Sequence, residues 1–210
     1  MNRGRVRIQE LGEIPADARL PTDKGDFRIR VFNDSETGMD HVALTLGEMQ
    51  GPDPVLLRVH SECLTGDVFG SLRCDCGPQL DAAINLIQEV GWGCILYLRQ
   101  EGRGIGLHAK IQAYNLQDKG ADTVEANLLL GHPADARDYG VASEILNLIG
   151  IESVCLLTNN PDKIGQLVSN GINVEERMPL VVGVGEDNRD YLAIKVDKMG
   201  HDITIEDLEG

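Results

Sequence analysis

Short apolar runs alternate with helix-like segments from Cys76 to Pro179, and this alternation limits the possible folds more than any other feature of the chain. In the first helix-like segment, Pro78 suits an opening turn and Gly91 suits the end of a helix. Strands that alternate with helices predict βαβ units and a partly parallel sheet. We expect helices over 76–91, 108–120, 139–150 and 160–171, and strands over 94–98, 152–158 and 172–179.

The residues before this region have the two-residue period of half-buried strands. Apolar and polar residues alternate over 27–31 and over 42–46, and residues 54–59 form a mostly apolar run. A small β-rich layer is expected there. The predicted fold class is therefore α/β, with α+β character in the N-terminal part, as a mixed sheet flanked by helices.

The charge of the chain limits its partners. A formal net charge of −15 argues against broad contact with DNA, RNA or anionic lipid, because these partners need a basic face. No stretch approaches the roughly 18 apolar residues of a membrane span, and residues 1–15 lack the apolar core of a secretion signal. We expect a soluble, cytoplasmic protein without a nucleic-acid or membrane partner. Basic residues in the middle of the chain could still form a pocket for a small anion.

The cysteines point to a metal. The chain has 5 cysteines and no secretion signal, so a disulfide framework is not expected. Cys63, Cys74 and Cys76 lie together in a polar segment, and three thiolates that leave one position open are typical of a catalytic zinc site. The alternative is three buried, reduced thiols. His60 is placed outside the zinc ligands, as a neighbouring or ligand-binding group.

A glycine-rich turn over 102–106 follows one predicted strand and opens a helix. Backbone N–H groups in such a turn can meet an anion. The spacing G-x-G-x-G is not the G-x-G-x-x-G dinucleotide fingerprint, and the chain has no G-x-x-x-x-G-K-[ST] loop. Glu101 and Arg103 in this turn could read a donor-and-acceptor edge such as that of guanine. The alternative is a turn that only joins strand to helix.

Two further segments contain charged residues at the starts of predicted helices. From spacing alone, Asp135 and Arg137 form an ordinary solvated or capping pair. Residues 158–163 join a strand end to a helix start, where ligands bind in many α/β sheets, and Lys163 lies one turn into that helix. A plain helix cap is the equal alternative for this second segment.

Several long motifs occur in one order and resemble those of the GTP cyclohydrolase II family. They are RVHSECLTGDVFGSLRCDCG from 58, RQEGRGIGL from 99, LQDKGADTVEAN from 116, DARDYG from 135, LLTNNPDK from 156 and KMGH from 198. The resemblance runs from about residue 20 to 201 and implies one catalytic domain over 20–201, with an N-terminal extension over 1–19 and a flexible acidic tail over 202–210. No dihydroxybutanone phosphate synthase segment precedes it, so the resemblance is to the monofunctional form, and it implies a homodimer.

The resemblance also assigns roles to individual residues. Cys63, Cys74 and Cys76 match the ligands of one Zn²⁺ per subunit. Asp135 matches the family's proposed proton acceptor, and Arg137 matches its proposed nucleophile. The remaining matches are Tyr114 as an active-site tyrosine, and the GTP contacts Arg58, Val59, His60, Ser61, Glu62, Gln79, Glu101, Gly102, Arg103, Thr123, Thr158 and Lys163.

The implied reaction opens the imidazole ring of GTP. Zinc-activated water would attack C8, formate and pyrophosphate would leave, a diaminopyrimidine ribosyl phosphate would form, and Mg²⁺ would bridge the substrate phosphates. This is the first committed step of riboflavin biosynthesis. Because a guanidinium is a poor nucleophile, Arg137 could instead be a positive clamp for pyrophosphate.

Three alternatives stay open at the level of sequence. One is a variant that stops at the formamide, although the presence of Tyr114 favours the full reaction. The others are a non-catalytic zinc- and GTP-binding module, and a nicotinamide-dependent oxidoreductase, which the glycine spacing disfavours. His132 and Ile194 depart from the family pattern, where Phe and Thr are usual.

Overall fold

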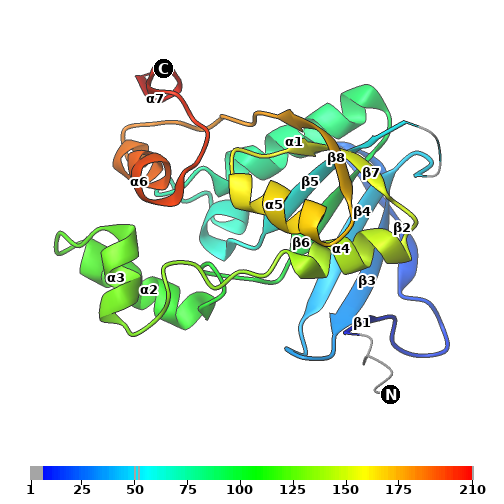
Figure 1. The fold of residues 1–210 in the computed structure, drawn as a ribbon, viewed down its shortest axis with the longest axis horizontal. Helices are drawn as coiled ribbons and strands as arrows, with labels where there is room; N and C mark the ends of the chain where they lie inside the picture. The colour runs from blue at the N-terminus through cyan, green and yellow to red at the C-terminus, as the bar shows by residue number, and fades with distance from the viewer. Residues whose placement is uncertain (1–6, 50, 52, 210) are drawn as a thin grey trace.

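The computed structural model describes residues 7–49, 51 and 53–209. The eight strands of the described residues form one mixed sheet in the order β1-β3-β4-β6-β5-β7-β8, and β2 pairs with β3 beside this path (Figure 1). The strands are β1 (Ile8–Gln9), β2 (Asp17–Thr22), β3 (Gly25–Asp34), β4 (Asp40–Leu46), β5 (Val55–Ser61), β6 (Gly93–Leu98), β7 (Ser153–Leu157) and β8 (Asn173–Met178). The helices are the π-helical turn η1 (Leu64–Val68), α1 (Cys76–Val90), α2 (Gly106–Gln117), α3 (Thr123–Leu129), α4 (Gly140–Leu148), α5 (Pro161–Ser169), α6 (Arg189–Met199) and α7 (Ile205–Glu209).

The sheet has an antiparallel half and a parallel half. Strands β1 to β4 and β6 pair antiparallel, whereas β5 pairs parallel with both β6 and β7, and β7 pairs parallel with β8. Helix α1 connects β5 to β6 and α5 connects β7 to β8, which are the crossover connections that parallel strands require. The predicted α/β fold with a β-rich N-terminal layer is therefore confirmed.

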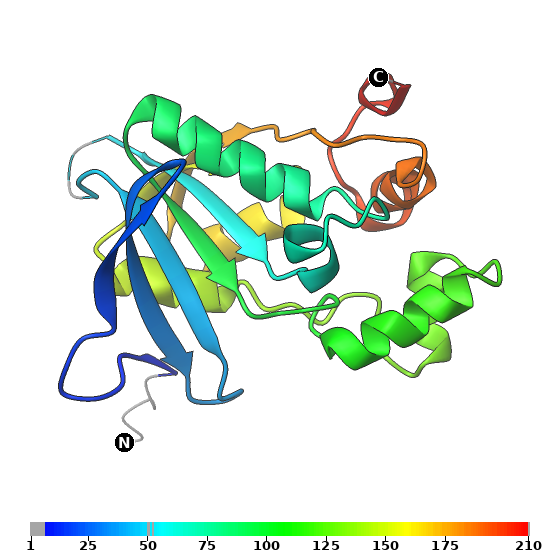
Figure 2. The same cartoon turned by 180° about the vertical axis from the view of Figure 1, so that it is seen from behind.

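Helices cover both faces of the sheet (Figures 1 and 2). On one face, Ala83 and Ile87 of α1 pack with Leu56 and Ile95 of the central strands. On the other face, α4 and α5 pack over a larger core. Its fully buried members include Leu57, Val59, Leu96, Leu98, Ile145, Leu146 and Leu167. Because neighbouring residues of β5 point to opposite faces, this strand supplies both cores and is buried on each side.

The helices α2, α3 and α6 lie beyond the carboxyl ends of β5 and β6, outside the layers that cover the sheet (Figure 2). Ligands of open α/β sheets bind at this end of the strands. The turn over 99–105 and the segment over 130–139 connect α2 and α3 to the body of the protein, and residues 179–188 connect β8 to α6. The fold therefore places the motif-bearing segments around one end of the sheet.

The structure confirms the predicted strands and helices and adds elements that the sequence pattern missed. Strands β1 and β2, the turn η1 and the helices α3, α6 and α7 were not expected. The division into 1–19, 20–201 and 202–210 stays a prediction. However, β1 and β2 are paired with β3, and Ile203 and Leu208 are buried beside Leu192, so both described ends are attached to neighbouring elements. Among the described residues, no helix is long and apolar enough to cross a membrane.

Candidate active site

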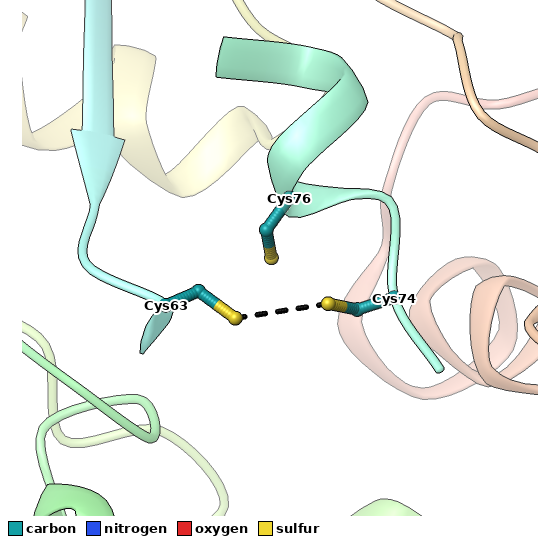
Figure 3. Close-up of side chains that lie close together, drawn as sticks. All are labelled: Cys63, Cys74 and Cys76. Atoms are coloured by element: carbon teal, nitrogen blue, oxygen red, sulfur yellow. Dashed lines mark hydrogen bonds between the residues drawn. The ribbon is translucent and has the colours of Figure 1, made fainter. Parts of the chain in front are cut away.

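The three predicted metal ligands meet at one point (Figure 3). Cys63 directly precedes η1, Cys74 lies in the loop before α1, and Cys76 is the first residue of α1. Their sulfur atoms all lie within 4.8 Å of one another, and the sulfurs of Cys63 and Cys74 are 3.7 Å apart. Three converging thiols in the wall of a polar pocket could bind a zinc ion and leave its fourth coordination position open to the pocket. The other two cysteines, Cys94 and Cys155, are strand residues that pack in the sheet cores.

Two glycines allow the backbone to approach the cysteine cluster closely. A Cβ on Gly66 would lie 2.9 Å from the sulfur of Cys74 and 3.2 Å from that of Cys63. A Cβ on Gly77 would clash with the carbonyl oxygen of Gly66. The turn η1 can therefore close over the cysteines only because both positions lack a side chain.

We expect Gly66→Ala to reduce metal binding, because the added methyl group occupies the space beside two sulfur atoms. A loss of about tenfold or more in zinc affinity is expected, the range seen when the surroundings of metal ligands are disturbed. Competition with a chromogenic chelator measures this affinity. Gly165→Ala in α5 is the matched control, because a Cβ there meets nothing within 4 Å. Equal affinity in the two variants would show that the close approach has no role.

Lys110 of α2 and Glu101, in the turn before α2, contact the cysteine cluster and the turn η1. The ammonium of Lys110 donates to the sulfur of Cys63 at 3.1 Å and to Glu101 Oε1 at 2.7 Å. Glu101 also accepts from the backbone N–H groups of Leu64 and Gly102, at 2.7 and 2.8 Å. Hydrogen bonds from the neighbouring cysteines, with Lys110, lower the pKa of Cys63, so a thiolate is favoured there. Both oxygens of Glu101 thus already bind the protein, and a contact with guanine would use their remaining lone pairs.

A second buried network lies behind Cys63. Asp67 accepts from His60 Nε2 at 3.0 Å, from the hydroxyl of Tyr97 at 2.8 Å and from the backbone N–H of Cys63 at 2.9 Å. Burial lowers the pKa of His60, so the imidazole is neutral near pH 7. His60 therefore binds Asp67 with one nitrogen and is not one of the three residues of the cysteine cluster.

The cysteines form part of the wall of a pocket of about 1050 Å³, which includes space open to solvent. Most of the predicted site residues line it. These are Arg58, His60, Ser61, Glu62, Cys63, Cys74, Cys76, Gln79, Glu101, Gly102, Arg103, Tyr114, Thr123, Arg137, Thr158 and Lys163. Two predicted residues, Val59 and Asp135, do not line it. The carbonyl of Val59 accepts from Lys163 at 2.8 Å, and Asp135 lies behind Arg137.

Three cations of this pocket have no carboxylate partner within the described part of the chain. Arg58 donates to the carbonyl of Leu157 and to the amide oxygen of Gln79, and Lys163 donates to a backbone carbonyl. Arg103 donates to the hydroxyl of Tyr191, at 3.4 Å. Of the described atoms, Arg58 Nε and Arg103 Nη1 are buried without any hydrogen-bond partner. Burial, together with nearby cations, lowers the pKa of Lys163 well below its ordinary value. Such an arrangement favours a bound anion.

Arg137, the predicted nucleophile or clamp, is by contrast a paired cation. Its Nε donates to Asp135 Oδ1 at 2.9 Å, and its backbone N–H donates to the same oxygen at 3.0 Å. Burial acts to lower the pKa of Arg137, but Tyr139 and Asp135 raise it overall, so the guanidinium stays protonated. A protonated, bidentate guanidinium is suited to binding an anion and not to nucleophilic attack.

Tyr114 places a hydroxyl beside the cysteine turn. Its oxygen lies 3.4 Å from the hydroxyl of Thr65, and burial raises its pKa to about 12. The phenol is therefore a proton donor at neutral pH.

Arg103 is the only non-glycine residue with a positive φ in the described ranges, at 61°. Non-glycine residues rarely adopt this conformation, and such strain is common at functional sites. The turn is held from outside, because Ala136 N–H donates to the carbonyl of Arg103 at 3.0 Å. The backbone thereby fixes where this unpaired guanidinium enters the pocket.

Several polar residues of the site were not among the predicted site residues. Asp75, Lys110, Tyr191 and Lys195 line the pocket, and Asp67 supports it from behind. Lys110 and Asp75 belong to segments that already carried predicted residues, so their proximity was the available signal. Tyr191 and Lys195 lie in α6, which no pattern indicated.

His201, which lines the pocket, links pH to stability. Burial, together with the cations Lys195, Arg137 and Lys163, lowers the pKa of His201 to about 3. The unfolded chain binds this proton at about pH 6.5, so the unfolded state holds more protons between these values and stability falls as the pH falls from about 6.5 towards 3.

Replacing His201 with Gln is expected to make stability less dependent on pH in that window. Urea unfolding at several pH values between 7 and 4 measures it. His108→Gln is the control, because His108 is exposed on α2. An unchanged pH dependence in His201→Gln would exclude His201 as a source of acid sensitivity.

This chain is similar to known proteins over most of its length. The family model of GTP cyclohydrolase II matches residues 13–179. A protein named GTP cyclohydrolase-2 from Neisseria meningitidis serogroup C is 58% identical over 194 residues, which cover 92% of this chain and 98% of that protein. Another GTP cyclohydrolase-2, from Proteus mirabilis, is 57% identical over 186 residues, which cover 89% of this chain and 94% of that protein.

Two further similar proteins are longer than this chain. A riboflavin biosynthesis protein, RibBA, from Mycobacteroides abscessus is 55% identical over 193 residues, which cover 90% of this chain and 46% of that protein. A solved structure of a two-domain 3,4-dihydroxy-2-butanone 4-phosphate synthase from A. baumannii is 17% identical, with a TM-score of 0.40 over 74% of this chain and 35% of that chain.

The mixed sheet, the cysteine cluster and the cationic pocket define an α/β enzyme with a candidate metal centre at the ends of its central strands. The family match and the sequence identities then specify which family of α/β enzymes this is. The chain belongs to the GTP cyclohydrolase II family, as the motifs predicted.

Proposed function

We propose that this chain opens the guanine imidazole ring of GTP at a zinc site, releases formate and pyrophosphate, and yields 2,5-diamino-6-hydroxy-4-(5-phosphoribosylamino)pyrimidine for riboflavin biosynthesis. One observation carries the proposal. Three thiols within 4.8 Å of one another share a pocket with three cations that have no carboxylate partner among the described residues. A substrate that needs both a metal-activated water and a polyphosphate site fits this combination.

Cys63, Cys74 and Cys76 would hold the zinc, since thiolates are its preferred ligands. When bound, zinc supplies a Lewis acid that lowers the pKa of water to about 7. The protein itself provides the surrounding charges. Lys110 offsets the negative charge of the thiolates from 3.1 Å, and Tyr114 is protonated and can donate to a leaving nitrogen.

The phosphates would lie against Arg58, Arg103 and Lys163, whose unused donors make them the natural anion site. Mg²⁺ would accompany the phosphates as part of the substrate. Arg137 would act as a positive clamp on pyrophosphate as it leaves, with Asp135 holding the guanidinium in place. The remaining predicted GTP contacts stay proposals, as do a homodimeric assembly and a cytoplasmic location.

The test is to incubate the protein with GTP and Mg²⁺, with and without a zinc chelator, while following formate, pyrophosphate and the pyrimidine product. Release of all three that stops with the chelator supports the proposal. Pyrophosphate without formate would indicate the variant that stops at the formamide. Binding of GTP without any product would indicate a non-catalytic module, and turnover that resists the chelator would contradict a zinc mechanism.

A further inference from the structure

Part of the pocket wall comes from a segment that follows the family match. The match ends at residue 179, whereas Tyr191, Lys195, Met199, His201 and Ile203 line the pocket. These residues belong to α6 and to the stretch after it, which lie at the same end of the sheet as α2 and α3 (Figures 1 and 2).

This C-terminal wall, defined as residues 189–203, has little apolar attachment to the rest of the protein. Its buried members Leu192 and Ile203 form a small cluster with Leu208, separate from the two cores that cover the sheet. Its links to the body are polar. Asp202 N–H donates to the carbonyl of Asn159 at 2.8 Å, and Lys198 pairs with Asp122 at the surface. Apolar packing alone therefore does not explain where the wall lies.

The most buried of these links joins Lys195 to Asp75. The ammonium lies 2.6 Å from Asp75 Oδ1, and the two side chains are only 12% and 4% exposed. Asp75 lies between Cys74 and Cys76 in the sequence, and its other oxygen accepts from Gln79. Breaking one side of a buried ion pair leaves an uncompensated charge, so this contact has a strong influence on the position of the wall.

Hydrogen bonds also connect Lys195 to the cations proposed to bind the phosphates. Gln79 also accepts from Arg58, so a chain of hydrogen bonds runs from Lys195 through Asp75 and Gln79 to one of the unpaired cations. Lys195 is in addition close enough to lower the pKa of Lys163 by charge repulsion. An anion beside Arg58 and Lys163 would offset the repulsion between Lys195 and Lys163. It would thereby stabilise residues 189–203 in their place at the pocket.

We propose that Lys195 is a positioning residue, which holds residues 189–203 as a wall of the substrate pocket through Asp75, and that a bound polyphosphate stabilises this wall. The second half of this inference rests on the proposed function, whereas the first half concerns the free protein. The ligand class follows from the cations, which suit a nucleoside triphosphate or pyrophosphate.

Hydrogen exchange in the full-length protein, read by mass spectrometry over 189–203, tests both halves. Lys195→Met is expected to speed exchange in this segment at least about tenfold in the free protein, the consequence of unpairing a buried charge. In the wild-type protein, pyrophosphate and GTP are each expected to slow it. Lys195→Met should also raise the KM for GTP more than it lowers kcat, and Lys195→Arg should partly restore both.

Lys198→Met is the matched control, because Lys198 lies on the same helix but is 45% exposed in its ion pair. It should leave exchange near Leu192 and the KM unchanged. If Lys195→Met does not fold, Asp75→Asn breaks the same pair from the other side and should speed exchange in the same segment. Unchanged exchange in the variants would overturn the positioning role. If neither pyrophosphate nor GTP slows exchange over 189–203 in the wild type, the proposed stabilisation of the wall by polyphosphate is wrong, even in a protein that releases formate. Absence of formate release alone would count only against the proposed function.

Discussion

Replacing Cys76 with Ser is expected to remove bound zinc and to lower formate release from GTP more than about 100-fold. The reason is chemical, because a serine hydroxyl stays protonated near pH 7 and is a poor zinc ligand beside two thiolates. Loss of even an outer partner of a metal ligand costs 10–100-fold in affinity or activity, so loss of a ligand should cost more. Zinc content after dialysis and the rate of formate release measure the effect together.

The protein contains its own control for this experiment. Cys155 lies in β7, apart from the cysteine cluster, and it is half-buried beside the α1 face of the sheet. Cys155→Ser should therefore retain zinc and turnover. If Cys76→Ser kept its zinc and its rate, or if both variants lost them equally, the three-thiol site would be wrong.

Replacing Lys163 with Met is expected to lower kcat/KM about 10- to 100-fold and, at the same time, to make the free protein more stable. A charge-assisted hydrogen bond contributes about 1.5–3 kcal/mol, which gives the fold-change in kcat/KM. Burial, with Arg58, Arg137 and Lys195 nearby, lowers the pKa of Lys163, so the folded state holds this charge at a cost. A methionine of similar length removes that cost. Thermal unfolding without ligand and steady-state kinetics measure the two effects.

The pH dependence of stability provides a second measure of Lys163. Because its pKa is lowered in the folded state, the unfolded chain binds more protons between that lowered value and about 10.4, and stability rises with pH across this interval. Lys163→Met should lack this rise. Lys119→Met is the control, since Lys119 is exposed and its ammonium donates to the side chain of Asn115. A Lys163→Met variant that is less stable and fully active would show an ordinary structural lysine.

The cysteine cluster could be predicted because its spacing is local. Cys74 and Cys76 are two residues apart, and Cys63 is close to them in the sequence, so spacing alone limits their separation. The same holds for the strands and helices from Cys76 to Pro179, where the period of apolar residues shows which face is buried. The short strands β1 and β2 could not be predicted in this way, since β2 is largely exposed and depends on pairing with β3.

The roles of the charged residues could not be read from their spacing. Arg137 and Arg58 are both arginines in motif-rich segments, yet one is paired with a carboxylate and the other has a buried nitrogen without a partner among the described residues. Glu101 looked suited to reading a guanine edge, and the structure shows its two oxygens accepting from Leu64, Gly102 and Lys110. Its contact with guanine stays a prediction.

The sequence by itself therefore determined the fold class, the family and the three thiols, because periodicity and closely spaced ligands are properties of short segments. Only the tertiary structure decided which cations are free to bind an anion. That outcome depends on carboxylates and amides from distant elements, as when Lys195 of α6 meets Asp75 beside the cysteines, 120 residues earlier in the chain. Electrostatic pairing acts through space and burial, and the chain must fold before a charge gains or lacks its partner.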